Sequence, residues 1–258
     1  MKKAVLPAAC IERYIMNALD SQVAVVTGAA RGVGKAIAHR LAAMGAHVLL
    51  VARSADQLKS MREQIVAAGG LATSYPCDLA DASAVAQFGE AVAREHQRCD
   101  ILVNNAAIGL DGKLLHEVTP EEWDLLFDTN LRGPYLMIRA IVPLMIAANS
   151  GHIINISSLA GRNPLPKGAA YAASKWGLNG LTYSVAEELR QFNIRVSVIA
   201  PGSINTGFND HSGRGAASGK DPNKKLQPDQ IASVVATLVT QPAQSFISEV
   251  LMRPTQKP

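Results

Sequence analysis

The chain has 258 residues, of which 48% are hydrophobic, 18% charged and only 5% aromatic. This much apolar material excludes a disordered, collagen-like or coiled-coil chain, and the length suits one large domain or two small ones. The net charge of +4 comes from scattered lysines and arginines with no arginine-rich run, which argues against a nucleic-acid partner.

The three cysteines and the apolar runs bear on the compartment. Cys10, Cys77 and Cys99 form no CxxC pair and have no metal-ligand spacing. We therefore expect no disulfide scaffold, no metal site and a reducing compartment, the cytoplasm. No continuous apolar run approaches the roughly 18 residues that span a bilayer, so no membrane partner is expected.

Residues 1–20 are interpreted as an N-terminal extension. Two lysines precede the short apolar stretch 4–11, which resembles the start of a signal peptide, but Glu12 and Arg13 interrupt it before a cleavage site. We expect the extension to pack on the domain or on a partner subunit, with a helix over 12–19 as one option. A mis-assigned start codon is the alternative.

From residue 22 onward, short β-branched runs alternate with helix-length segments. The predicted strands are 23–26, 47–51, 72–76, 101–103, 152–156, 195–199 and 247–251, and the predicted helices are 33–44, 55–68, 82–97, 121–148, 170–192 and 228–240. Most of the strands are continuous apolar runs, as in parallel strands covered on both faces. The pattern predicts an α/β fold with a doubly wound parallel β-sheet, a Rossmann fold with helices on both faces, as one domain over 21–258.

Residues 209–225 contain no Val, Ile, Leu or Phe and therefore cannot build a core. They follow the sixth predicted strand, at the carboxyl edge of the sheet where ligands bind in such folds. We expect an exposed, mobile loop there, either simply solvated or acting as a lid over the substrate.

The first predicted strand runs into the sequence TGAARGVG at 27–34 and then into a helix. Glycines permit a tight turn and the close approach of a pyrophosphate to the free N–H groups at the helix N-terminus. The predicted cofactor ligands in this loop are Gly28, Arg31, Gly32, Val33 and Gly34. A purely structural turn is the alternative.

The choice of dinucleotide depends on the end of the second predicted strand. An acidic residue there would hold the ribose of NAD, but this chain has Ala52 followed by Arg53. Guanidinium groups at Arg53 and Arg31 can bind the 2′-phosphate of NADP with paired hydrogen bonds. The sequence therefore predicts NADP(H) over NAD(H), with two solvent-facing arginines as the alternative.

Four polar residues carry the predicted chemistry. Tyr171 and Lys175 are four apart on one predicted helix, so both face the same side, and a nearby ammonium favours the phenolate. Ser157 and Ser158 follow the fifth predicted strand, and Ser158 lies thirteen residues before the tyrosine. A hydroxyl there can stabilise charge on a substrate oxygen or simply satisfy a backbone group. Asn130 lies inside a predicted helix, a poor place for asparagine because its amide competes with the backbone.

These motifs together resemble the short-chain dehydrogenase/reductase family over residues 22–252. The resemblance implies a catalytic set of Asn130, Ser158, Tyr171 and Lys175, in which Tyr171 transfers the proton, Ser158 polarises the carbonyl, Lys175 also holds the nicotinamide ribose and Asn130 holds a water that links Lys175 to solvent. It adds further cofactor residues, namely Asp78 and Leu79 beside the adenine, Asn105 and Ala106 after the fourth strand, and Pro201, Gly202, Ile204 and Thr206 beside the nicotinamide. Ala107 departs from the usual NNAG.

The implied activity is hydride transfer between NADP(H) and a carbonyl or secondary alcohol. The pattern is similar to 3-oxoacyl-acyl-carrier-protein reductases, but the positions where those enzymes commonly carry basic docking residues hold Asn149 and Phe192. Basic residues elsewhere that could attract an acidic partner are Arg190, Arg195, Arg214, Lys220, Lys224 and Lys225, and the expected pocket residues are Ala160, Arg162, Pro164, Lys167 and Phe208.

Two further expectations complete the sequence-based hypothesis. A dinucleotide-sensing binding protein without turnover is the alternative function, although it would be expected to lack the tyrosine or the lysine. By resemblance, the chain should form a homo-oligomer, a dimer or a tetramer, through the helices at 121–148 and 170–192.

Overall fold

The structure is a computed structural model that describes residues 17–110, 112–208 and 221–256. The predicted helix over 12–19 lies mostly outside the described residues, as does most of the predicted substrate loop, including Arg214 and Lys220. Residues 17–20 form a turn in which Leu19 is 1% exposed. The backbone N–H of Leu19 donates to the carbonyl of Met44, so the packed core already includes this residue.

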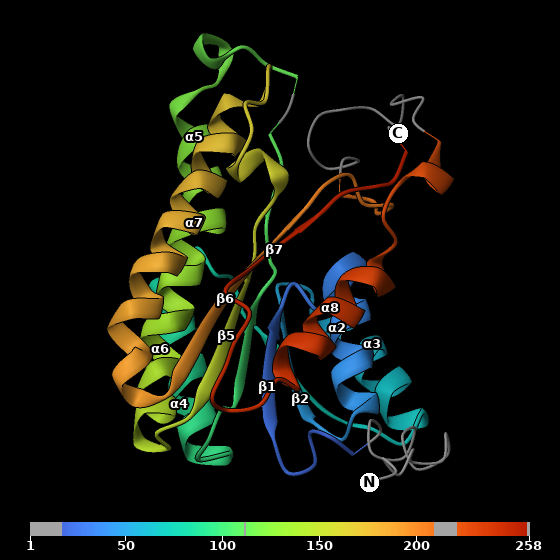
Figure 1. The fold of residues 1–258 in the computed structure, drawn as a ribbon, viewed down its shortest axis with the longest axis vertical. Coiled ribbons are helices and arrows are strands. Elements are labelled where there is room, and N and C mark those ends of the chain that lie inside the picture. Colours follow the sequence, from blue (N-terminus) through green and yellow to red (C-terminus); the bar gives the residue numbers. More distant parts are fainter. Residues whose placement is uncertain (1–16, 111, 209–220, 257–258) are drawn as a thin grey trace, which may run out of the picture.

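Within the described residues, seven strands form one parallel sheet in the order β3-β2-β1-β4-β5-β6-β7 (Figure 1). The strands are β1 (Val23–Thr27), β2 (His47–Ala52), β3 (Leu71–Pro76), β4 (Ile101–Asn104), β5 (Gly151–Ile156), β6 (Ile194–Pro201) and β7 (Glu249–Met252). The strand order reverses between β1 and β4, which creates the switch point outside the carboxyl ends where doubly wound sheets bind ligands.

Helices cover both faces of this sheet, and the predicted doubly wound fold is confirmed. On one face lie α2 (Gly32–Ala43), α3 (Ala55–Ala67) and α8 (Pro228–Val239), and on the other lie α4 (Ala82–Glu95), α6 (Gly133–Ala147) and α7 (Ala169–Leu189), with α5 (Pro120–Phe127) leading into α6 (Figure 1). Each layer encloses its own apolar cluster against the sheet. Short 3-10 turns occupy Leu115–Glu117, Leu159–Gly161, Arg190–Phe192 and Pro222–Lys224.

Helix ends follow the capping residues in the sequence. Thr119 and Glu122 form a full capping box at the start of α5, and the Ser54 hydroxyl accepts from the Gln57 backbone at the start of α3. Gly45 and Gly69 follow α2 and α3 with φ of +97° and +84°, a backbone region that side-chain-bearing residues rarely adopt. These residues determine where α3 and α5 begin and where α2 and α3 end.

The predicted helix over 121–148 is divided in the structure. Asp128–Arg132 form a π-helical turn between α5 and α6, and the Gly133 backbone N–H donates to Asp128, five residues back. Pro134 has no N–H for the carbonyl of Asn130 four residues earlier, so the regular helical ladder is interrupted at this point. The interruption places Asn130 in a fully buried position, 0% exposed.

By length and composition alone, one helix among the described residues, Pro120–Ala148, is apolar enough to cross a membrane. It combines α5, the π-helical turn and α6, and 44% of its apolar window is buried within the fold. Met137 and Ile141 pack into the core beneath the sheet. A helix that covers a sheet passes the same test, so this is weak evidence for a membrane span.

Candidate active site

The predicted site residues lie at or near the carboxyl ends of the strands from β1 to β6 and on α7, except for Asn130, which lies in the π-helical turn. Because all the strands are parallel, these ends share one edge of the sheet. Residues as far apart in the sequence as Gly28 and Thr206 are thereby brought to the same edge.

The glycine loop after β1 is pressed against the end of β4. The Asn105 side chain donates to the Thr27 carbonyl at 2.9 Å, and the Thr27 hydroxyl accepts the backbone N–H groups of Asn105 and Ala106 at 2.9 and 3.0 Å. A Cβ on Gly34 would lie 2.2 Å from the Gly28 carbonyl oxygen and 2.5 Å from the Asn105 amide nitrogen. Only glycine fits position 34, as a tight dinucleotide turn requires.

The N-terminus of α2 remains available to an anion. Gly28 and Gly32 have φ of +64° and +53°, and Arg31 at the N-cap makes no side-chain capping hydrogen bond within the described structure. The first-turn N–H groups, which include those of Val33 and Gly34, therefore have no side-chain cap, and such groups attract phosphate oxygens. The loop fits a dinucleotide pyrophosphate.

The segment after β6 reaches this glycine loop from the other side. The Gly202 backbone donates to Met252 at 2.8 Å, which fixes the chain just beyond Pro201. Ile204 pairs with Leu226, and the Thr206 side chain lies 3.4 Å from where a Cβ on Gly32 would be. The residues that the resemblance predicts beside the nicotinamide therefore lie close to the glycine loop.

The residues that the resemblance predicts beside the adenine lie after the ends of β2 and β3. The Cys77 backbone donates to the Ala52 carbonyl at 2.9 Å, so Asp78 follows at the same edge as Arg53. Asp78 is exposed and accepts from the Ala80 backbone, whereas Leu79 is only 6% exposed.

Arg31 and Arg53 are both exposed. Among the residues that the structure describes, neither guanidinium takes part in an ion pair. Both side chains therefore keep their hydrogen-bond donors available for an anionic ligand.

Lys175 and Tyr171 form the centre of the candidate site. Lys175 is 2% exposed, and its Nζ donates to the carbonyl oxygen of Ile156 at 3.0 Å. The same nitrogen lies 5.9 Å from the centroid of the Tyr171 ring, because one turn of α7 places both residues on one face. Burial lowers the pKa of Lys175 to about 8, since desolvation disfavours the ammonium.

Two serines follow β5, and one of them contacts α7. The Ser158 hydroxyl accepts from the Ala160 backbone at 3.1 Å and caps the 3-10 turn that follows. Its neighbour Ser157 is buried and donates to the carbonyl of Lys175 at 3.4 Å. Gly161 in this turn packs so closely on α7 that a Cβ would lie 2.8 Å from that same carbonyl oxygen.

Asn130 uses its whole amide group within the protein. Its Oδ1 accepts from the Ile108 backbone N–H, and its Nδ2 donates to the Ile108 carbonyl, both at 2.9 Å. Nδ2 also donates to the Ser174 hydroxyl at 3.2 Å. The side chain therefore clamps the loop after β4 to α7. Ser174 and Thr27 are supporting residues that the sequence did not single out, although Thr27 opens the glycine loop and Ser174 lies between Tyr171 and Lys175.

The expected substrate-pocket residues divide into two groups. The Phe208 ring lies 6.2 Å from the Tyr171 ring, and the Lys167 carbonyl accepts from the Gly112 backbone at 2.8 Å, linking the two loops around the site. Arg162 instead makes a bidentate pair with Glu249, at 2.8 and 2.5 Å, and contacts the Tyr183 hydroxyl. Its guanidinium charge is thus already paired.

Sequence comparisons agree with this geometry. A sequence model of the short chain dehydrogenases matches residues 22–216. A 3-oxoacyl-[acyl-carrier-protein] reductase from Synechocystis sp. is 38% identical over 235 residues, covering 90% of this chain and 95% of that protein. An uncharacterised oxidoreductase from Staphylococcus epidermidis is 32% identical over 239 residues, covering 93% of this chain and all of that protein.

Solved structures agree as well. A metagenomic short-chain oxidoreductase in complex with NADP is 54% identical, with a TM-score of 0.81 over 93% of this chain and all of that one. An alcohol dehydrogenase from the archaeon Thermococcus sibiricus, complexed with 5-hydroxy-NADP, is 29% identical, with a TM-score of 0.83 over 92% of this chain and 98% of that one.

Proposed function

Because the chain belongs to the short-chain dehydrogenase family of oxidoreductases, we propose that it transfers a hydride between NADP(H) and a carbonyl or secondary-alcohol substrate. The observation that carries the proposal is the buried amine of Lys175 held 5.9 Å from the Tyr171 ring. Burying a lysine costs folding free energy. Titratable groups with strongly perturbed pKa values are concentrated at functional sites, so the position of this amine beside the Tyr171 phenol supports a catalytic role.

The residues of the chain act on the proton rather than on the hydride. The nicotinamide, when bound, supplies or accepts the hydride. In the reducing direction Tyr171 donates its proton to the carbonyl oxygen, and the Ser158 hydroxyl hydrogen-bonds that oxygen as negative charge develops. The Lys175 ammonium favours the resulting phenolate, while Asn130 holds the Ile108 backbone beside α7.

NADP(H) is preferred over NAD(H) in this proposal. Arg31 and Arg53 lie exposed beside the glycine loop and the end of β2, where a 2′-phosphate would add two negative charges, and no acidic residue occupies position 52 to repel it. The NADP in the metagenomic oxidoreductase and the 5-hydroxy-NADP in the archaeal dehydrogenase support the same choice.

The substrate is a carbonyl compound or secondary alcohol, with 3-oxoacyl thioesters among the candidates because of the 38% identical Synechocystis enzyme. Carrier docking has little support on the surface. Position 149 is asparagine and position 192 phenylalanine, while Arg190 pairs with Glu187 at 3.1 Å.

The test is a substrate panel followed through NADPH absorbance. Acetoacetyl thioesters, diketones, quinones and steroid ketones should include at least one compound that is turned over, and thioester activity matching the best ketone would identify the fatty-acid reaction. Tight NADPH binding with no turnover on any compound would favour the non-catalytic dinucleotide sensor instead.

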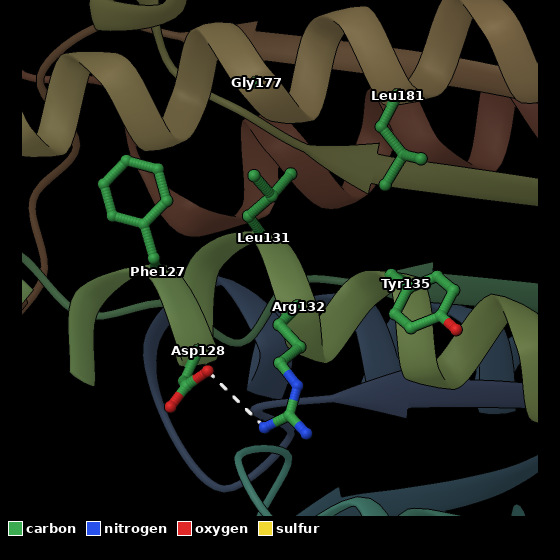
Figure 2. Close-up of a pocket in the computed structure, with 7 residues that line it drawn as sticks. All are labelled: Phe127, Asp128, Leu131, Arg132, Tyr135, Gly177 and Leu181. Carbon is green, nitrogen blue, oxygen red and sulfur yellow. Dashed lines mark hydrogen bonds and ion pairs between the residues drawn. The ribbon is translucent and has the colours of Figure 1, made fainter. Parts of the chain in front are cut away.

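We also propose that the chain pairs with a second copy of itself through the α5–α7 face. Figure 2 shows an apolar hollow on this face, with Phe127, Leu131 and Tyr135 on one side and α7 at Gly177 and Leu181 on the other. Tyr135 is 47% exposed, and exposed apolar patches of this kind are typical of protein–protein interfaces. Sedimentation of the purified protein measures the oligomeric state. The cytoplasmic location stays a prediction.

A further inference from the structure

A chain of buried hydrogen bonds joins β4, β5 and α7. The Asn104 side chain donates to Asn155 at 2.9 Å, Asn155 donates to the Thr182 hydroxyl at 2.8 Å, and that hydroxyl donates to the Leu178 carbonyl at 2.6 Å. The three polar residues are 2%, 0% and 0% exposed. Burying a polar group costs free energy unless it is hydrogen-bonded, and here the hydrogen bonds link one element to the next.

Two members of this chain are sequence neighbours of site residues. Asn104 directly precedes Asn105, which grips the glycine loop, and Asn155 directly precedes Ile156, whose carbonyl accepts from Lys175. Thr182 lies seven residues beyond Lys175, about 10 Å along the helix axis at ~1.5 Å per residue. Strand β5 is therefore bonded to α7 at two points, which fixes both the rotation and the axial position of the helix.

Apolar packing alone would hold α7 weakly. Its buried positions are Ala170, Ala172, Ser174, Lys175, Leu178, Asn179, Thr182 and Leu189, so large apolar side chains contribute at only two of them. Contact between small side chains is non-directional and allows a helix to slide or rotate, whereas hydrogen bonds have a narrow range of distance and angle. The polar contacts of α7 are therefore the contacts best suited to fix its register.

We propose that Thr182, through Asn155, is a positioning residue that sets the register of α7 and so the placement of Tyr171 and Lys175. This inference rests on the proposed function, but its structural part does not require turnover. The hydroxyl of Thr182 acts as both acceptor from β5 and donor within α7, so no apolar residue of the same size can replace it.

The test compares Thr182→Val with two reference variants. Valine keeps the shape but removes the hydroxyl, leaving the buried Asn155 amide without its acceptor. Thr182→Ser restores the hydroxyl. Thr237→Val on α8 is the matched control, because the Thr237 hydroxyl also donates to a carbonyl four residues back, at 3.0 Å, but lies far from the site and is exposed.

With the best substrate of the panel, kcat of Thr182→Val should fall by about tenfold or more, since a misplacement of about 1 Å costs up to ~100-fold. The affinity for NADPH should fall by a smaller factor than kcat, because Thr182 lies outside the glycine loop. Thr182→Ser should recover most of kcat, and Thr237→Val should match the unmodified protein. An unchanged kcat in a folded Thr182→Val protein would overturn the proposal.

Hydrogen–deuterium exchange tests the positioning role of Thr182 without substrate. The positioning proposal therefore stays testable even if the proposed function is wrong. Thr182→Val should speed exchange along the α7 turns that contain Tyr171 and Lys175. Faster exchange confined to the turn around Thr182 would mean a local structural role and would contradict the proposal. If the valine variant does not fold, Thr182→Ala removes the same hydroxyl with space for water at the Asn155 amide.

Discussion

The carbonyl oxygen of Ile156, the last residue of β5, accepts a hydrogen bond from the Lys175 Nζ at 3.0 Å. The sheet itself therefore holds the amine that faces Tyr171, and burial lowers the pKa of Lys175 to about 8. In the proposed mechanism, the amine is charged at neutral pH and supports proton transfer. As pH rises through about 8 it becomes neutral, and its effect on the phenol should be lost.

The first prediction follows from that sign. For reduction by NADPH, kcat/KM should decline as pH rises above about 8 in the unmodified enzyme. In Lys175→Arg the guanidinium stays charged throughout this range, so the alkaline decline should move upward or disappear even where the overall rate is lower. An identical alkaline limb in both proteins would show that Lys175 does not produce it.

Tyr171→Phe tests the proton donor. Phenylalanine keeps the ring beside Phe208 but removes the hydroxyl, so turnover should fall by about 100-fold to 10,000-fold, the usual contribution of a positioned acid. NADPH binding, measured by fluorescence titration, should stay within about twofold because the phosphate cradle does not involve this hydroxyl. Wild-type rates in Tyr171→Phe would remove the tyrosine from the mechanism.

Local patterns predicted the strands, the glycine loop and the motif residues because each depends on neighbours in the sequence. Thr119 and Gly45 act within one turn of chain, where the structure has a capping box and a positive φ. The last strand begins at Glu249 rather than at 247, because its start is set by pairing with β6.

Long-range side-chain pairing escaped sequence reasoning for the same reason. The sequence places Arg162 among the expected pocket residues but gives no sign of its pairing with Glu249, 87 residues away. The bond from Asn155 to Thr182 likewise depends on how α7 sits on β5. Motif spacing contains no information on either contact.

Cofactor preference can be tested at Arg53. Arg53→Ala should weaken NADPH binding by about tenfold, since a charge-assisted hydrogen bond contributes about 1.5–3 kcal/mol, and should leave NADH binding unchanged. Arg94→Ala is the control, because that arginine is equally exposed but pairs with Glu95 on α4. Equal dissociation constants for NADPH and NADH in the unmodified protein would refute the role assigned to the arginine.

His152 predicts how stability depends on acid. The ring is 1% exposed, and its Nε2 lies 2.8 Å from the Ser197 hydroxyl. That hydroxyl donates to the Ile247 carbonyl at 2.7 Å, so we assign the proton to Nε2. Burial, with Arg195 as a second cause, lowers the pKa of His152 to about 3 from an ordinary 6.5.

Between those two pKa values the unfolded chain binds a proton that the folded chain does not. The free energy of unfolding should therefore fall as pH drops below about 6.5, by at most ~1.4 kcal/mol per pH unit from this residue. Urea titrations at several pH values measure the slope, and His152→Gln should flatten it whatever its own stability. Parallel slopes in the two proteins would contradict the assignment.

Two glycine-to-alanine changes should affect different properties: Gly180→Ala should raise stability, and Gly34→Ala should lower NADPH affinity. Gly180 lies within α7 with no atom within 4 Å of an added Cβ, so Gly180→Ala should stabilise the protein by about 0.5–1 kcal/mol through reduced chain entropy.

In Gly34→Ala the new methyl group would lie 2.2 Å from the Gly28 carbonyl oxygen and must push the loop away from Asn105. NADPH affinity should then fall by more than about tenfold, because the backbone N–H groups no longer meet the pyrophosphate. Thermal unfolding and fluorescence titration of both variants measure the two effects, and a Gly34→Ala protein that binds NADPH normally would disprove the cradle.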